Sequence, residues 1–215
     1  MEKQVTCPGC KKSLSHKLVP PLLLHCNACT AVFTLHLPGD HTFVKTYYNP
    51  PIDCSVLKLG VTGIYLNSDF ELIGRIRSVN SFAISNEWLM YFQDGTYKWL
   101  TESTASYFVV DNQSILLNSR EVKDKKAGSN VKIKDHKYRI TEISKQLLIE
   151  TEGEIPLDAY SDDDYFKYEL INLEKENEFA TIVLHNKDEL ETFFSKKVEL
   201  NSLDLKGVTD FKDWI

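Results

Sequence analysis

The chain has 215 residues, of which 42% are hydrophobic and 26% are charged, and its formal net charge is −6. This balance excludes an intrinsically disordered chain and is ordinary for a globular protein with a sizeable core. No apolar run approaches the ~20 residues of a membrane-spanning helix. Residues 1–4 lead into the first motif without a signal-peptide pattern, so we expect a cytoplasmic protein in a reducing compartment.

Two Cys-x-x-Cys motifs lie near the N-terminus, Cys7-Pro8-Gly9-Cys10 and Cys26-Asn27-Ala28-Cys29, with fifteen residues between them. Each motif can form a knuckle, a tight turn in which two thiolates point at one ion, and two knuckles complete a tetrahedral site. The proline and the glycine of the first motif suit such a turn. The spacing is typical of paired zinc knuckles. The sequence therefore predicts a structural zinc ion bound by Cys7, Cys10, Cys26 and Cys29.

Alternatives to structural zinc stay open at this point. Two disulfides are disfavoured in a reducing cytosol, and a thioredoxin-like redox pair would need a single motif at a βα junction. Iron is compatible with four thiolates, which do not by themselves distinguish it from zinc. Catalytic zinc is not expected, because four protein ligands leave no position for water. The remaining candidate ligands lack the spacing of the four cysteines, and we interpret them as packing or surface residues: His16, His25, His36, His41 and Cys54.

Charge is distributed unevenly along the chain. Residues 1–45 hold five Lys against two acidic residues, a net charge of +3, whereas residues 150–178 hold eleven acidic residues against two Lys. The acidic stretch disfavours non-specific nucleic-acid binding by the body of the protein. The basic ribbon keeps nucleic acid as an alternative partner.

The pattern of short apolar segments predicts a mostly β protein in three parts. These are a zinc ribbon (1–48), a first antiparallel β unit (56–111) and a second one (128–215), barrel- or sandwich-like and packed with the first as one body. Two consecutive prolines indicate a linker near residues 46–55. The polar run 112–127 indicates a loop between the two units.

Within the ribbon and the first unit, the pattern predicts strands over 31–37, 43–48 and 70–79, with Gly74 marking a bulge. The clearest hairpin is centred on Asp94-Gly95, the preferred pair for a two-residue type I′ turn. Such a turn places Gln93 opposite Thr96. One face then carries a large apolar set, which we interpret as core rather than as a platform for stacking nucleic-acid bases: Trp88, Met90, Phe92, Tyr97 and Trp99.

The second unit weakly echoes the first, since Gly60 precedes Phe70 by ten residues as Gly128 precedes Tyr138. We expect a turn at 152–156, strands near 165–173 and 179–184, and a last strand over 196–200. Asp162-Asp163-Asp164 is interpreted as a solvated turn, because it lacks the ligand spacing of an EF-hand. One or two short C-terminal helices complete the prediction. One is capped by Asn186, with Leu190, Phe193 and Phe194 facing inward, and Phe211 and Trp214 dock the C-terminus on the body.

These elements resemble, in order, a bacterial domain-of-unknown-function family, number four-one-seven-eight, whose members carry a similar N-terminal ribbon. The resemblance covers about residues 5–205. It implies a β-rich bacterial accessory protein of membrane-stress or polyamine-related systems and supplies no catalytic residues. The motifs that carry it are Leu59-Gly60, Gly74-Arg75-Ile76, Glu87-Trp88-Leu89, Asp94-Gly95, Trp99-Leu100 and Gly153-Glu154-Ile155-Pro156.

Three functions follow as hypotheses. The first is a non-enzymatic zinc-ribbon adaptor that binds a protein partner. The second is nucleic-acid binding through the basic ribbon, and the third is an enzyme whose carboxylates, Glu87 and Glu154 among them, converge in the β body. No catalytic sequence motif supports the third hypothesis.

Overall fold

The computed structural model describes residues 3–36, 41–46, 55–118, 121–122, 124–159, 165–184 and 189–210. The predicted fold class is confirmed, because the chain is mostly β and its paired strands are antiparallel. Its named helical elements are two 3₁₀ turns, η2 (Leu157–Ala159) and η3 (Leu200–Leu203). Both are single turns, and among the described residues there is no helix that could span a membrane.

The N-terminal ribbon contains a two-stranded hairpin and a second small sheet. The hairpin joins β1 (Lys3–Thr6) to β2 (Ser13–His16). The second sheet has the order β3–β4–β5, formed by β3 (Leu22–His25), β4 (Ala31–Leu35) and β5 (His41–Thr46). The predicted strand after the second knuckle and its returning partner are therefore confirmed.

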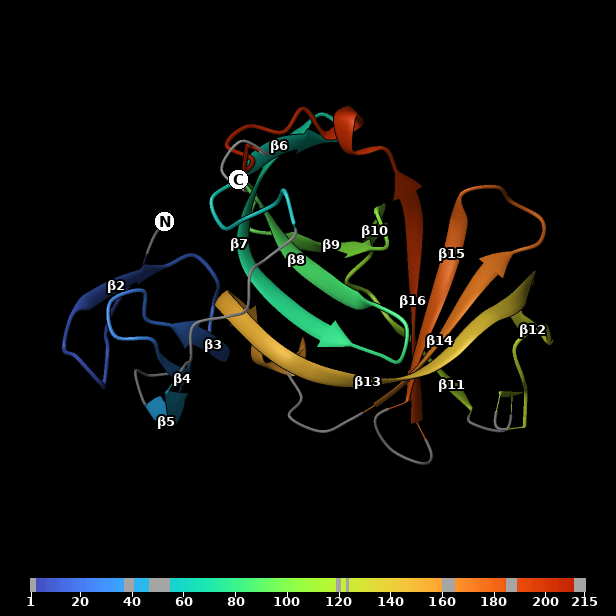
Figure 1. Cartoon of the computed structure of the whole chain (residues 1–215), viewed down its shortest axis with the longest axis horizontal. Coiled ribbons are helices and arrows are strands. Elements are labelled where there is room, and N and C mark those ends of the chain that lie inside the picture. The colour runs from blue at the N-terminus through green and yellow to red at the C-terminus, as the bar shows by residue number, and fades with distance from the viewer. Residues whose placement is uncertain are drawn as a thin grey trace.

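The rest of the chain forms two meanders of antiparallel strands. The first contains β6 (Thr62–Tyr65), β7 (Ser68–Val79), β8 (Ile84–Phe92), β9 (Tyr97–Ser103) and β10 (Ser106–Val110), followed by β11 (Ile115–Asn118). The second contains β12 (Asn130–Ile133), β13 (His136–Pro156), β14 (Tyr165–Asn172), β15 (Glu178–Leu184) and β16 (Glu189–Val198). In Figure 1 the ribbon lies on the left, the first meander in the centre and the second meander on the right.

Each meander has its own apolar core. The residues that follow the last strand of each meander pack into the core of the other meander. Leu203 of η3 is buried with Trp88, Met90 and Leu100 in the first core. Val122, which follows β11, is buried in the second core. The edge of β16 joins the two, since its first half pairs with β11 and its second half with β10. The two meanders therefore share one continuous sheet.

The predicted echo between the two units has matching local structure. The backbone N–H of Gly60 donates to Leu72 O at 2.8 Å, and that of Gly128 donates to Ile140 O at 2.7 Å. Both glycines have positive φ, +83° and +89°, so each opens its unit with the same backbone turn. Leu72 and Ile140 return the bond, donating to Val61 O and Ser129 O.

Strand β13 runs through the stretch predicted to be a turn. It pairs with β14 and β7 and then continues to pair with β3, where Ile155 lies opposite Leu23 (Figure 1). The turn prediction at 152–156 is therefore wrong. Gly153 does adopt a positive φ of +69°, but it lies opposite Gly74 in a close strand pair, where a Cβ on Gly74 would stand 2.0 Å from Glu154 O. The bulge predicted at Gly74 is confirmed by the register shift there.

The hairpin at Asp94-Gly95 forms with a different register from the predicted one. Its loop has three residues, because Phe92 N–H donates to Thr96 O at 2.9 Å and Gly95 N–H to Phe92 O at 3.0 Å. Gly95 has φ +85°, as in a type I turn followed by a bulge. Tyr91, and not Phe92, therefore lies opposite Tyr97.

This one-residue change divides the predicted aromatic face into two. Trp88, Met90 and Phe92 are buried in the first core, as predicted. Tyr97 and Trp99 lie on the opposite face of the sheet and pack, half-buried, against the core beneath the ribbon. A side-chain period of two makes this exchange of faces unavoidable once the register shifts.

The helix predicted from Asn186 to Phe194 is also wrong, because residues 189–198 form β16. Leu190 is buried in the second core, whereas Glu191 and Phe193 face the other side, as a strand requires. Pairing on both edges of β16 outweighs the local capping signal. The final strand predicted over 196–200 is the end of β16, which stops at Val198, and η3 begins at Leu200. Several other predictions fall wholly or mostly outside the described residues: the cap at Asn186, the linker near 46–55 with Cys54, the turn at 162–164, and Phe211 and Trp214.

Candidate metal centre and inter-unit pocket

The four cysteines of the two motifs meet at one point of the ribbon. Their sulfur atoms all lie within 4.8 Å of one another, and this is the group of candidate metal ligands found among the described residues. Cys7 Sγ lies 3.7 Å from Cys29 Sγ, and Cys10 Sγ lies 3.7 Å from Cys26 Sγ. These distances exceed the ~2.05 Å of a disulfide and approach the ~3.8 Å between sulfurs of a tetrahedral site with Zn–S bonds of ~2.3 Å. The geometry is that of a site able to hold a metal ion, plausibly zinc.

The two knuckles have the same backbone hydrogen bonds. Lys11 N–H donates to Cys7 O and Thr30 N–H donates to Cys26 O, each at 3.0 Å. Both residues have a positive φ angle, 64° at Lys11 and 57° at Thr30. The two Cys-x-x-Cys motifs thus form the same turn. Each turn directs its two sulfur atoms to a common centre.

The thiols compete for ionisation. Burial opposes the charge on Cys26, but hydrogen bonds from the backbone N–H groups of Ala28 and Cys29 outweigh it and lower its pKa to about 7. At Cys29 the Ala31 N–H favours the thiolate, yet burial and the neighbouring thiols raise its pKa to about 12. Four adjacent thiolates need a cation to offset their charge, so metal binding here would release protons.

Besides the pairing of β3 with β13, one carboxylate of the body holds the ribbon. Glu154 of β13 accepts hydrogen bonds from the backbone N–H of Lys17 at 2.9 and 3.0 Å and from that of Leu18 at 2.9 Å. Burial raises the pKa of Glu154, and the two N–H donors oppose that rise. Lys17 Nζ adds an ion pair with Glu71 of β7 at 2.6 Å. The basic ribbon therefore directs one of its lysines inward.

The neighbouring histidines make other contacts. His16 Nδ1 lies 2.9 Å from Leu18 O, and His25 Nε2 lies 2.8 Å from Thr151 Oγ1 of β13. The His16 contact is local to the end of β2, whereas the His25 contact, like that of Glu154, holds the ribbon against β13.

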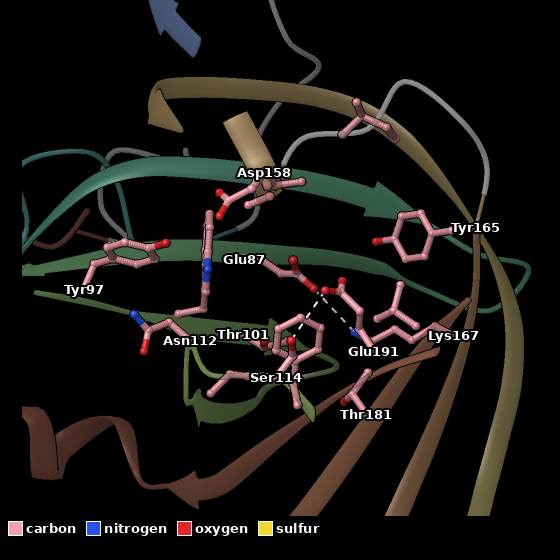
Figure 2. Close-up of a pocket in the computed structure, with 17 residues that line it drawn as sticks. Glu87, Tyr97, Thr101, Asn112, Ser114, Asp158, Tyr165, Lys167, Thr181 and Glu191 are labelled. Atoms are coloured by element: carbon pink, nitrogen blue, oxygen red, sulfur yellow. Dashed lines mark hydrogen bonds and ion pairs between the residues drawn. The ribbon is translucent and has the colours of Figure 1, made fainter. Parts of the chain in front are cut away.

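A pocket of about 230 Å³ lies between the two meanders. Its walls come from β7, β8, β9 and β10 on one side, from β14, β15 and β16 on the other, and from η2. Lys167 and Thr101 are buried in it, while Asp158 and Asn112 are exposed at its mouth. Figure 2 shows its polar side chains, drawn from strands far apart in the chain.

An ion pair joins the two meanders inside this pocket. Lys167 Nζ of β14 lies 3.5 Å from Glu87 Oε1 of β8 (Figure 2). It also lies 3.7 Å from Glu169 Oε1. Burial lowers the pKa of Lys167, but the charges of these two carboxylates outweigh it and raise the pKa above its ordinary value. Burial, with the charge of Glu87, raises the pKa of Tyr165 to about 12. Lys167 is therefore a permanent cation beside Glu87.

The carboxylates named from the sequence do not share a site. Glu87 lines the pocket, and Glu154 holds the ribbon. The structure instead brings Glu191 of β16 beside Glu87 and Lys167, where Ser114 Oγ donates to Glu191 Oε1 at 3.4 Å (Figure 2). The only local signal for these residues is a charged side chain within an apolar strand, which does not reveal its neighbours.

A second charged group that the sequence did not indicate lies where β7 of the first meander pairs with β13 of the second. Arg77 Nη1 contacts Glu150 Oε1 at 2.8 Å, and Arg75 Nη2 contacts Glu150 and Glu152 at 3.3 and 2.9 Å. The Arg75 guanidinium also lies 4.8 Å from the centre of the Trp88 ring. These buried contacts between β7 and β13 stabilise the join of the two meanders.

No protein-family model, no curated protein and no solved structure matches this chain. The resemblance to the family of unknown function therefore stays a prediction.

Proposed function

We propose that this chain is a non-enzymatic cytoplasmic accessory protein, in which a zinc-loaded ribbon is structural and the β body binds a protein partner. The metal part rests on the four clustered thiols. Four protein ligands close a tetrahedral site, so an ion there has no position for a substrate or for an activated water. The ribbon then serves to brace the body that it packs against.

Zinc is the proposed ion, because paired knuckles at this spacing are typical zinc sites. Elemental analysis of the purified chain tests this assignment directly. We expect a single zinc ion per chain. An iron-loaded chain would absorb visible light through its thiolate bonds and would overturn the choice of zinc.

The observation that carries partner binding is an exposed apolar row at the end of the β7–β8 hairpin. Val79 pairs with Ile84 on one side and with Leu147 of β13 on the other, so the row crosses three adjacent strands. Ile84 and Leu147 are 53% and 43% exposed, and Phe82 at the hairpin tip is 80% exposed. Contiguous apolar surface of this kind marks an interaction site more often than single exposed residues do.

Site-specific photocrosslinking in cells tests the row. A photoreactive residue at position 82 should give one discrete protein adduct, and the same residue at Leu66, which is also exposed but lies at the β6–β7 turn, should not give it. With the purified partner, Phe82→Ser combined with Ile84→Thr should weaken binding by ~10-fold or more, as expected for central interface residues. Identical adducts at both positions, or none at position 82, would contradict the proposal.

The nucleic-acid alternative receives less support from the structure. One ribbon lysine, Lys17, is paired with Glu71 and does not project freely from the surface. Binding to single- or double-stranded nucleic acid that falls steeply with salt would nevertheless favour it over a protein partner.

A further inference from the structure

The inter-unit pocket carries an excess of negative charge. Among the described residues that line it, Lys167 is the only cationic side chain, against three carboxylates, those of Glu87, Asp158 and Glu191. Lys167 is also near Glu169, outside the pocket lining, at 3.7 Å. The positive charge of Lys167 is therefore already balanced by Glu87 and Glu169. The remaining carboxylates give the pocket a net negative charge, which favours a positively charged ligand.

The walls of the pocket are aromatic as well as acidic. Tyr97 and Trp99 of β9 and Phe193 of β16 line it, and all three are half-buried. Burial and the charge of Asp158 raise the pKa of Tyr97, which places that carboxylate close enough to act on the ring hydroxyl. Aromatic faces attract cations, and they also cover an apolar ligand body.

The two kinds of group are arranged around one space. Figure 2 shows Glu87, Glu191 and Lys167 pointing toward one another, with Asp158 and Tyr97 on another side of the pocket. A ligand that enters past exposed Asp158 meets the aromatic rings and the half-buried carboxylates of Glu87 and Glu191. The volume of about 230 Å³ suits a small molecule, since drug-sized ligands occupy pockets of about 300 Å³ or more.

We propose that this pocket binds a small organic cation, an alkyl ammonium whose charged head lies at Glu87 and Glu191 and whose apolar body packs on Trp99 and Tyr97. An anion of the same shape meets repulsion from the carboxylates. A neutral molecule of the same shape gains the apolar contacts alone. This proposal does not depend on the partner-binding row, which lies on another part of the surface.

Three matched ligands separate charge from shape: n-butylammonium, n-butanol and butyrate. Each is titrated into the zinc-loaded full-length chain at constant ionic strength, with the Trp99 indole N–H followed by NMR. We expect n-butylammonium to bind, n-butanol to bind at least ~10-fold more weakly, in line with the loss of a charge-assisted hydrogen bond, and butyrate not to bind. Equal binding of n-butanol, preference for butyrate, or no binding of n-butylammonium would overturn the proposal.

Variants then locate the site. Glu191→Gln should weaken n-butylammonium binding by ~10-fold, and Trp99→Leu by ~3-fold. Asp135→Asn removes a carboxylate that is 98% exposed and lies outside the pocket, and it should leave binding unchanged. If Glu191→Gln does not fold, Asp158→Asn at the exposed mouth tests the same charge and should weaken binding by ~3-fold at least. Unchanged affinity in the folded carboxylate variants would show that the cation binds elsewhere.

Discussion

The four-cysteine site brings together side chains from two turns of one small ribbon, whereas the inter-unit pocket brings together charged side chains from strands of two different meanders. The ribbon turns are alike, and each is held by its own backbone hydrogen bonds. The pocket has no such local support, since Glu87 and Lys167 meet only because β8 and β14 face each other across the join. The ribbon site should therefore be lost without unfolding of the meanders. The pocket, which strands of both meanders assemble, should be lost only when the meanders themselves unfold or separate.

The largest expected effect is the loss of the metal centre in Cys26→Ser. We expect the variant to lose its metal and the ribbon to unfold, because structural zinc contributes about 10–16 kcal/mol of apparent binding free energy in small ribbons and fingers. The separate apolar cores of the two meanders should stay folded. Elemental analysis with hydrogen exchange measures both parts. Cys54→Ser, a cysteine outside both motifs, is the control and should keep its metal; a protected ribbon without metal would contradict the prediction.

The second prediction concerns Gly74→Ala, at the place where β7 pairs with β13. The substitution should disrupt this pairing and, through Glu154, the attachment of the ribbon. The added Cβ would lie 2.0 Å from Glu154 O, so β13 must move away from β7 and take its anchoring carboxylate with it. We expect a loss of about 3 kcal/mol or more in the free energy of unfolding, as for severe overpacking. Gly95→Ala is the control, because its Cβ meets only the Tyr91 hydroxyl at 3.9 Å. Its positive φ should cost about 1–2 kcal/mol, and equal losses in the two variants would refute the steric argument.

What the sequence predicted well depends on nearby residues. The knuckles, the bulge at Gly74 and strands such as β7, β14 and β15 follow from spacing and alternation within short segments. The hairpin register did not, because Asp94-Gly95 suits both a two-residue and a three-residue loop, and the choice of loop decides which face Tyr97 and Trp99 occupy. Residues 189–198 carry a helix signal at one end, yet pairing on both edges makes them a strand.

The pocket was beyond prediction for a related reason. Lys167 lies in the most acidic stretch of the chain, where composition indicates a solvated surface. Its contact with Glu87 joins β14 to β8, two strands with no sequence relationship that could reveal the contact. Glu154 shows the same limit, since its role in anchoring the ribbon depends on the course of β13 past the expected turn.

The ion pair across the join gives a smaller and more specific test, Lys167→Met. Removing the cation leaves Glu87 without its partner across the join, and we expect a loss of about 2–3 kcal/mol, since breaking even a partly buried pair costs more than the pair contributes. The double variant with Glu87→Leu should recover part of this loss. Lys132→Met is the control, because its partner Asp135 is 98% exposed and the contact is 3.8 Å, and it should cost under about 0.5 kcal/mol. Chemical denaturation measures all three, and similar losses for Lys167→Met and Lys132→Met would show that the join does not depend on this charge.

The smallest effect concerns the proton of Tyr165, which reports on the pocket without disturbing its shape. Burial beside Glu87 raises the pKa of Tyr165 to about 12, so the folded protein holds this proton more tightly than the unfolded chain, whose tyrosine has a pKa of 10.0. The stability that it contributes is present below pH 10 and is lost as the pH rises toward 12. Tyr107 also has a pKa raised to about 12, through burial and the charge of Glu102, so absorbance of the wild type alone does not assign the transition. The difference at 295 nm between wild type and Tyr165→Phe isolates it, and a difference centred near pH 10 would mean that water reaches Tyr165 and that the inner end of the pocket is open.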